Sequence, residues 1–417
     1  MYRFALLPCA GVALAVASLG STANAQIAVS ANDGKVELVD GVVKYKKDGK
    51  DTVSILDIGA NPVKLIAEIP AAASVVGPPF SVAIAPSGEI ALVTAAKRGD
   101  GDPPKEASDD QVLVIDLKKS TLAASLIAKA KAVVTKGTAA GVTTPEVIAT
   151  LHAGKGAAGV SFNSSGTLAL VANRDEGTVS VFTVAGKTVT AAGKVDLLDE
   201  KIGPSAVSFL PDGKGALVTL DGPTGNKIAV LSVDGTKVEF TKRMLTAGVA
   251  PYGIDVSSKG DIAIAANVGG GRTGDSDTIS IIDLKGNVPR VVNTVSVAAS
   301  PEGIKISPDG QYVAVSSQNG TNRPKSSPFF HDNGVLAVFQ IRGTELQKVA
   351  EAPVGRWCQG LVWSAKSNRI LVQCMVEQEI QVFNLSGRGT KKLDQQPSIK
   401  VSGGPAGIRT IERPTEK

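Results

Sequence analysis

The sequence has few of the residues from which metal and redox sites are built: its 417 residues include only 3 Cys and 2 His. Two separated histidines cannot form a standard zinc cage, and no C-x-x-C-H haem attachment occurs. Aromatic residues make up only 4% of the chain, and the net charge of +5 comes from basic residues interspersed with acidic ones. Because no basic stripe with interleaved aromatics is present, we expect no nucleic-acid partner.

Long hydrophobic runs are also absent, and the main apolar segment, at the N-terminus, is too short to span a bilayer comfortably. Residues 1–25 contain Arg3, an apolar run over 10–19 and the small-x-small triplet Ala23-Asn24-Ala25. This pattern is typical of a secretory signal peptide, with an uncleaved anchor as the alternative. We therefore expect cleavage after Ala25 and a periplasmic or secreted protein without a membrane span.

Cleavage leaves two cysteines, Cys358 and Cys374, in an oxidising compartment. Residues 360–364 and 369–375 read as two strands joined by a polar turn at 366–368. Folding that hairpin about its turn sets position 358 opposite position 374. The sequence predicts a disulfide between them, with two buried free thiols as the alternative.

One short unit recurs along the chain: a small loop, an apolar strand, a polar turn and a second strand. The aligned positions of its copies are Ser81, Gly159, Ala206, Gly253, Gly303, Gly360 and Gly407. A third strand and a fourth, more polar strand follow the first two, as in 278–284 and 291–297. Four antiparallel strands repeated every 40–50 residues or so are typical of propeller blades.

Counting the copies predicts a closed ring. Six complete blades run from about Phe80 to Val401, and leftover strands lie at 52–58, 63–69 and 407–411. Together these would form a seventh blade built from both chain ends, which hides the edge strands. The sequence therefore predicts an all-β, seven-bladed β-propeller of four-stranded antiparallel blades, rather than two separate β domains.

The mature chain, 26–417, is thus expected to be one propeller domain with one departure from the period. An Ala/Lys-rich insertion at 118–145 has helical spacing of apolar residues and predicts a short amphipathic helix. The 45 glycines are expected at the beginnings of blades and at hairpin turns, where tight bends and positive φ are needed.

The repeats resemble a known type. The segments 169–184 (ALVANRDEGTVSVFTV) and 264–284 each have an apolar strand ending in Ala-Asn, a loop, and a strand such as Thr-Val-Ser-Val. This pattern resembles the YVTN-type propeller repeat of the wider WD40-like superfamily, although no Trp-Asp dipeptide ends a third strand. It is also similar to the lactonase-like seven-bladed propellers and to the quinoprotein amine dehydrogenase heavy chains. The resemblance implies the fold and, more weakly, lactone hydrolysis or a place in a quinone- or copper-linked dehydrogenase.

Loops before the first strand and between the second and third strands of each blade share one face of a propeller, at the mouth of the channel. We expect a protein partner or small ligand to bind there. The predicted ligand-binding residues are Arg98, Arg174, Asp175, Asp221, Tyr252, Asn267, Arg272, Glu302, Arg323, His331, Arg356 and Trp357.

The sequence says less about which reaction this face could catalyse. His331, Glu302 and Arg356 are candidates for ring-opening hydrolysis, since a His that faces a carboxylate or Arg at the mouth can act as a general base. A plain surface histidine is the alternative for His331. The G-x-G-x-x-G match at 269–274 leads into a strand instead of a helix, so a dinucleotide site is rejected.

No cofactor is predicted with the exception of calcium, for which two acidic pairs are weak candidates. Carboxylate oxygens suit calcium, but neither pair matches an EF-hand loop. Plain solvated turns are the alternative. The two pairs are Asp100 with Asp102 and Asp275 with Asp277.

These features favour a monomeric binding or scaffold protein over an enzyme, because binding requires only the rigid ring and its variable loops. A lactonase-like hydrolase and a propeller subunit of a quinone- or copper-linked dehydrogenase stay open as alternatives.

Overall fold

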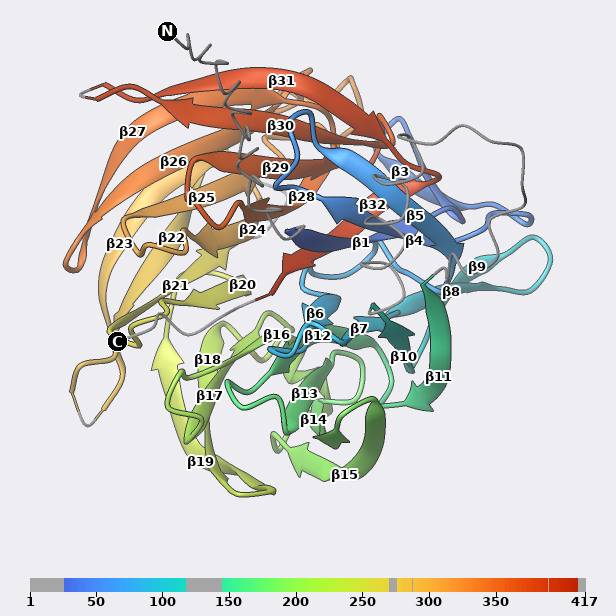
Figure 1. The fold of residues 1–417 in the computed structure, drawn as a ribbon, viewed down its shortest axis with the longest axis vertical. Coiled ribbons are helices and arrows are strands. Elements are labelled where there is room, and N and C mark those ends of the chain that lie inside the picture. Colours follow the sequence, from blue (N-terminus) through green and yellow to red (C-terminus); the bar gives the residue numbers. More distant parts are fainter. Residues whose placement is uncertain (1–25, 118–144, 270–275, 287, 389, 412–417) are drawn as a thin grey trace, which may run out of the picture.

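A computed structural model describes residues 26–117, 145–269, 276–286, 288–388 and 390–411. Seven four-stranded antiparallel sheets are arranged in a ring around a common axis (Figure 1), which confirms the predicted all-β propeller. In the described part of the chain the single helix is the 3-10 turn η1 (Glu200–Ile202), and no helix is long and apolar enough to cross a membrane. The predicted signal peptide, 1–25, and residues 118–144 of the predicted insertion lie outside the described residues.

Each blade consists of an inner, a second, a third and an outer strand; blades 1 to 6 follow the chain, and the closing blade joins both ends. The inner strands are β6 (Val82–Ile84), β12 (Ala157–Phe162), β16 (Pro204–Phe209), β20 (Pro251–Val256), β24 (Pro301–Ile306), β28 (Cys358–Trp363) and β32 (Gly404–Thr410). The second strands are β7 (Ile90–Thr94), β13 (Leu168–Asn173), β17 (Gly215–Leu220), β21 (Ile262–Asn267), β25 (Tyr312–Ser317), β29 (Arg369–Cys374) and β1 (Ile27–Asp33). The third strands are β10 (Gln111–Asp116), β14 (Thr178–Ala185), β18 (Lys227–Asp234), β22 (Ser276–Asp283), β26 (Gly334–Arg342), β30 (Glu379–Ser386) and β4 (Thr52–Asp57). The outer strands are β11 (Glu146–His152), β15 (Thr188–Asp196), β19 (Lys237–Thr246), β23 (Arg290–Ala298), β27 (Glu345–Val354), β31 (Lys392–Lys400) and β5 (Lys64–Pro70).

The core of the ring lies between the faces of neighbouring blades. Second strands such as β13 and β21 are buried along their whole length, because a blade lies against each of their faces. The outer strand β15 is mostly exposed and buries only Val189 and Val195. Burial therefore decreases from the second strands to the outer strands, which explains why the first strands of each repeat are apolar and the fourth strands are polar.

Glycine serves two different needs in the blades. In the turn after an inner strand, Gly166 has φ of +70°, as expected for a hairpin turn. Directly before the inner strands β12, β16 and β32, Gly156, Gly203 and Gly403 also have positive φ, as expected. Inside the inner strands φ is not positive, and the reason for glycine is space. A Cβ on Gly303 would lie 2.0 Å from the carbonyl oxygen of Gln359, and one on Gly159 would lie 2.6 Å from that of Ser205. Inner strands of adjacent blades approach too closely for a side chain at these positions.

The closing blade contains the three predicted terminal strands and one that the repeats did not reveal. Its order is β32-β1-β4-β5, so the C-terminal strand lines the channel and β1, immediately after the predicted cleavage site, pairs with it. The missed signal was the Ala31-Asn32 ending of β1, which repeats the Ala-Asn ending of β13 and β21.

The Ala-Asn ending has a structural role within each blade. The Asn173 amide donates to Thr178 Oγ1 and Ser180 Oγ of the third strand, both at 2.9 Å. Asn267 makes the same two bonds with Thr278 and Ser280, both at 3.0 Å. The motif therefore fastens the second strand to the third.

Candidate functional site

The channel has two mouths. At the upper mouth the inner strands begin, and the loops between second and third strands lie there; at the lower mouth the inner strands end in hairpin turns. The predicted binding face is the upper mouth. Each blade places there the residue just before the aligned position of its repeat: Phe80, Ala158, Ser205, Tyr252, Glu302, Gln359 and Ala406.

Arg174, from the loop after β13, reaches across to blades 3 and 4. Its Nη1 and Nη2 donate to the two carboxylate oxygens of Asp221 at 2.8 and 2.6 Å, and Ser205 bonds to both side chains. The guanidinium also lies 5.3 Å from the ring centroid of Tyr252. A two-point Arg–carboxylate pair with a ring on one side is held in one orientation.

Glu302 follows next around the ring, with Gln318 donating a hydrogen bond to its Oε1. Burial raises the pKa of Glu302 to about 8, against the lowering effect of hydrogen bonds from Gln359 and Gln318 and of the Arg174 charge. Its Oε2 has no hydrogen-bond partner among the described residues, although the side chain as a whole is partly exposed. The carboxyl group is therefore free on one oxygen and exchanges its proton near neutral pH.

Tyr252 lies beside the Arg174 guanidinium, and the charges of Arg174 and Glu302 both change the pKa of its hydroxyl. Burial raises the pKa of its hydroxyl well above the ordinary value, even though Arg174 lowers it. The phenol consequently keeps its proton and can donate a hydrogen bond throughout the neutral range. Ser205, Arg174, Asp221, Tyr252, Glu302, Gln318 and Gln359 form what we call the upper cluster.

Three insertions lie on the same face as the upper mouth. They are the hairpin β2–β3 (Val36–Val39 and Val42–Tyr45), the hairpin β8–β9 (Lys97–Asp100 and Lys105–Ser108) and the loop 318–333. The backbone N–H of Lys325 donates to Asp40 at 2.8 Å, and Lys47 pairs with Asp102 at 2.6 Å. Lys97 in turn pairs with Asp175 of blade 2 at 2.8 Å. The insertions thus form a linked cap over the closing blade and blades 1 and 5.

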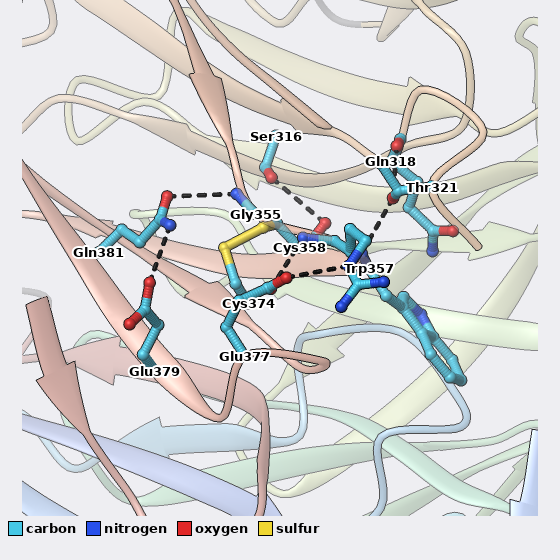
Figure 2. Close-up of a disulfide and its surroundings, with 11 residues drawn as sticks. Ser316, Gln318, Thr321, Gly355, Trp357, Cys358, Cys374, Glu377, Glu379 and Gln381 are labelled. Atoms are coloured by element: carbon cyan, nitrogen blue, oxygen red, sulfur yellow. Dashed lines mark hydrogen bonds and ion pairs between the residues drawn. A yellow bond between two sulfur atoms is a disulfide. The ribbon is translucent and has the colours of Figure 1, made fainter. Parts of the chain in front are cut away.

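A disulfide anchors blade 6 beside this cap (Figure 2). Cys358 begins β28 and Cys374 ends β29, both fully buried, as the hairpin register predicts. Cys374 takes the position that Asn173 and Asn267 hold in their blades. Next to it, the Trp357 N–H donates to Thr321 Oγ1 at 2.9 Å, so the disulfide steadies a strand that supports the loop 318–333.

We expect the double variant Cys358→Ala/Cys374→Ala to lose about 3 kcal/mol of unfolding free energy, the value typical of a closed loop of this length. Urea unfolding measures the loss. A reducing agent should weaken the wild type by a similar amount and leave the double variant unchanged. Two free thiols in the unfolded, unreduced mature protein would contradict the disulfide.

The other residues predicted for ligand binding lie around the upper cluster with partners of their own. Arg98 donates to the carbonyl of Ser108 at 3.0 Å, Arg323 lies 5.2 Å from the ring centroid of Phe329, and Arg356 pairs with Glu377 at 3.1 Å. Trp357 is buried in an apolar cluster with Val36, Val75, Met375 and Ala406. Asn267 is buried in its blade, and Arg272 lies outside the described residues.

The three catalytic candidates have separate surroundings. Glu302 lies in the upper cluster, whereas Arg356 is bound to Glu377. His331 is exposed, with its Nδ1 2.9 Å from the carbonyl oxygen of Asn319. Glu302 interacts electrostatically with both members of the Arg174–Asp221 pair.

The acidic pairs considered for calcium are engaged elsewhere. Asp100 lies 3.8 Å from Arg98, Asp102 pairs with Lys47, and Asp277 accepts a 2.7 Å bond from the Ser300 N–H. Asp275 is not among the described residues. Over the described ranges, no group of three or more His, Cys, Asp or Glu residues is arranged to hold a metal ion.

The upper cluster contains three residues that are not among the predicted ligand-binding residues, namely Ser205, Gln318 and Gln359. The loop argument placed Ser205 and Gln318 on this face, and it missed Gln359. The signal that could have found two of them is register: Ser205 and Gln359 occupy the same repeat position as Tyr252 and Glu302. Polar residues at one repeat position of adjacent blades converge on the channel.

The family model described as "Lactonase, 7-bladed beta-propeller" matches residues 134–302, which span blades 2 to 4. This match confirms the resemblance to lactonase-like seven-bladed propellers. No curated protein matches the chain by sequence.

Solved structures share the fold at low identity. The periplasmic gluconolactonase of Pseudomonas aeruginosa is 16% identical, with a TM-score of 0.61, over 92% of this chain and 99% of that one. A candidate 6-phosphogluconolactonase of Bacteroides fragilis is 15% identical, with a TM-score of 0.66, over 94% and 99%. Hydrazine synthase of Kuenenia stuttgartiensis is 15% identical, with a TM-score of 0.58, over 83% and 98%. At these identities the likeness establishes the fold alone.

Proposed function

We propose that the protein is a lactonase-like hydrolase that opens a cyclic ester at the upper mouth, with Glu302 as the general base. The observation that carries this proposal is the buried Glu302 carboxyl, whose pKa of about 8 lets it exchange a proton in the working range of pH. The family match over blades 2 to 4 and the gluconolactonase with the same fold support the reaction class.

In the proposed reaction, the ionised Glu302 takes a proton from a water molecule while the water oxygen bonds to the carbonyl carbon. The carbonyl π electrons move to its oxygen, and the resulting oxyanion needs hydrogen-bond donors. We assign the Tyr252 hydroxyl and the Arg174 guanidinium as these donors, since the Arg174 charge lowers the pKa of Glu302 and the Glu302 charge raises the pKa of Tyr252. When the tetrahedral intermediate collapses, the ring C–O bond breaks and Glu302 returns the proton to the leaving alkoxide.

Arg174 has a second role in this scheme. Burial lowers the pKa of its guanidinium, but Tyr252 and Asp221 outweigh that effect and raise it overall. The group therefore stays charged, and Asp221 fixes its direction through two hydrogen bonds. A fixed cation requires no rearrangement as charge develops on the substrate.

The experiment is a screen of lactones and esters with wild type, Glu302→Gln and the matched exposed variant Glu351→Gln. Turnover by wild type and Glu351→Gln, lost in Glu302→Gln, would support the proposal. His331→Ala and Arg356→Ala test the two other catalytic candidates, and an equal loss in either would move the proposed base away from Glu302. Saturable binding without turnover would instead support the binding protein that the sequence favours. The dehydrogenase subunit stays a prediction.

We also propose that the chain is exported and loses residues 1–25. The disulfide suits an oxidising compartment. Gln26 already contacts the ring, since its N–H donates to Asp57 at 3.1 Å and its side chain accepts from the Ala365 N–H at 3.0 Å. Cleavage after Ala25 would leave these contacts in place.

The intact mass of protein recovered from a periplasmic extract is expected to correspond to residues 26–417. An Ala25→Asp variant, which breaks the small-x-small pattern, should accumulate as the longer precursor. A wild-type mass that retains residues 1–25 would contradict the proposed cleavage, and failure to recover the protein from the periplasmic extract would contradict the proposed export.

A further inference from the structure

The polar side chains of the upper mouth come mainly from two positions of the repeat. The position directly before the aligned one supplies Tyr252 and Glu302. The residue directly after the second strand supplies Arg174 in blade 2, Asp221 in blade 3 and Gln318 in blade 5. Asp221 fixes the guanidinium of Arg174 through two hydrogen bonds, so one member of this second set already serves to hold another group in place. Gln318 is the uncharged member of these three.

The register of blade 5 places Gln318 beside Glu302. Pro301 pairs with Ser317 in the ladder between β24 and β25, and the Gln318 N–H donates to the Ser300 carbonyl at 3.0 Å. The ladder thus fixes the backbone of Gln318 next to the start of the strand that carries Glu302. The Gln318 Nε2 donates to Glu302 Oε1. The contact is therefore made within one blade, between two strands whose register is fixed.

The orientation of the Gln318 amide points to a role toward Glu302. Only 1% of Gln318 is exposed, and its Oε1 has no hydrogen-bond partner among the described residues. A reversed amide would place one acceptor oxygen against another, so the contact with Glu302 fixes the direction of the group. A buried amide oxygen without a partner costs free energy. The amide is therefore oriented by Glu302, and the packing around it gains nothing from this orientation.

The groups that act on Glu302 oppose one another. Burial raises the pKa of its carboxyl to about 8, and the hydrogen bonds from Gln359 and Gln318 lower it. The Arg174 charge lowers this pKa as well, whereas the Asp221 charge raises it. Because Arg174 and Asp221 are paired with each other at 2.6 Å, their charges partly cancel at Glu302. The amide donors are thus the contacts that most directly offset the effect of burial.

The absence of charge on Gln318 bears on the pH at which Glu302 can exchange its proton. A cation in contact with a carboxyl typically lowers its pKa by about 1–3. A buried carboxyl without the donor would instead keep its proton to a still higher pH. A neutral amide lies between these cases and keeps the exchange near neutral pH. Tyr252 keeps its own proton in this range, so it does not change the charge around Glu302.

We propose that Gln318 is a positioning residue that sets the pH range in which the upper mouth works, by holding Oε1 of Glu302 and leaving Oε2 to exchange the proton. This inference rests on the hydrolysis proposed above. Gln318 acts through Glu302 and does not itself need to touch a substrate. Glu302 Oε2, which has no partner among the described residues, is then the atom that takes the proton from water.

Two substitutions at position 318 are expected to move the pH profile of kcat/KM in opposite directions. Gln318→Leu removes the donor, so the profile should level off at least about one pH unit higher than in wild type. Gln318→Lys supplies a cation, so it should level off at least about one pH unit lower. The control Gln347→Leu, on the exposed face of the outer strand β27 of the same blade, should keep the wild-type profile.

A residue that serves only the packing would give a different result. Both variants would then lose kcat/KM at every pH without moving the profile, and this outcome would overturn the proposal. Shifts of both variants in the same direction would also overturn it. If Gln318→Lys fails to fold, Gln318→Leu decides alone, since an unshifted profile in that variant contradicts the role of the amide.

Thermal melting between about pH 5 and pH 10 follows the same proton without turnover. Each chain is compared with the same chain carrying Glu302→Gln, which isolates the contribution of the Glu302 proton. This contribution is lost as the pH rises to the pKa of the folded state, so the loss should end at a higher pH in Gln318→Leu and at a lower pH in Gln318→Lys. These shifts without hydrolysis of any lactone would refute the hydrolysis and retain the effect of Gln318 on Glu302. Hydrolysis with unshifted profiles would refute the role of Gln318 alone.

Discussion

A chain truncated after Ser402 is expected to lose the cooperative fold of the whole ring. The deletion removes β32, in which all seven residues are buried, and leaves β1 without its channel-side partner. Inner strands on both sides, β28 and β6, lose a neighbour as well. Because each blade is supported by two others, opening the ring at one place exposes the apolar faces of the blades next to it.

The size of this effect follows from single residues. Ile408 is fully buried, and replacing a buried Ile by Ala usually costs about 2–5 kcal/mol. The truncation removes Ile408 together with six other buried residues and the ladder with β1, so the loss is a large share of the roughly 5–15 kcal/mol that stabilises an ordinary protein. We therefore expect aggregation, or a broad thermal transition far below that of the wild type.

Scanning calorimetry measures the transition, and a chain lacking only residues 412–417 is the control because it keeps all of β32. The control should melt as one transition close to the wild-type temperature. A truncation after Ser402 that melts at the wild-type temperature would show that the terminal strands do not close the ring.

The ring was predictable because it repeats. Each copy of the unit supplies the same alternation of strand and turn, so errors in one copy are corrected by the other six. β1 was missed because its repeat unit is split: its Ala-Asn ending is the second half of a unit whose first half, β32, lies at the other end of the chain.

The candidate site was predictable in part for the same reason. Arg174, Asp221, Tyr252 and Glu302 lie next to strands whose register the repeat fixes, and the structure brings them together. His331 and Arg323 lie in the long loop 318–333, and the path of such a loop depends on tertiary contacts such as Lys325 with Asp40.

Glu302→Gln is expected to lower kcat/KM for the hydrolysed lactone by about 10²–10⁴, the usual contribution of a general base. The substitution keeps the shape of the side chain and an oxygen that can accept the hydrogen bond from Gln318. The fold should therefore be retained, and the loss of kcat/KM would be due to the missing proton transfer. Glu351→Gln, on the exposed outer strand of blade 5, should retain wild-type kcat/KM.

The pH profile distinguishes a base from a residue that only shapes the site. Since burial raises the pKa of Glu302 to about 8, wild-type kcat/KM should rise about tenfold per pH unit below pH 8 and level off above it. The residual activity of Glu302→Gln should lack that rise, because glutamine does not titrate. A wild-type profile that is flat between pH 6 and about pH 8, or that falls as the pH rises, would exclude Glu302 as the general base.

Stability gives an independent readout of the same proton. The folded protein holds the Glu302 proton up to a pH of about 8, whereas the unfolded chain releases it near its ordinary pKa of 4.5. The stabilisation from this group is therefore complete below pH 4.5 and is lost as the pH rises through 8. Glu302→Gln should consequently melt at a higher temperature than wild type at pH 9, with the difference shrinking as the pH falls toward 5. If Glu302→Gln is more stable than wild type at pH 9 and inactive, the ionised Glu302 destabilises the fold but is required for the reaction. If Glu302→Gln is less stable than wild type at every pH, Glu302 contributes to the packing of the channel.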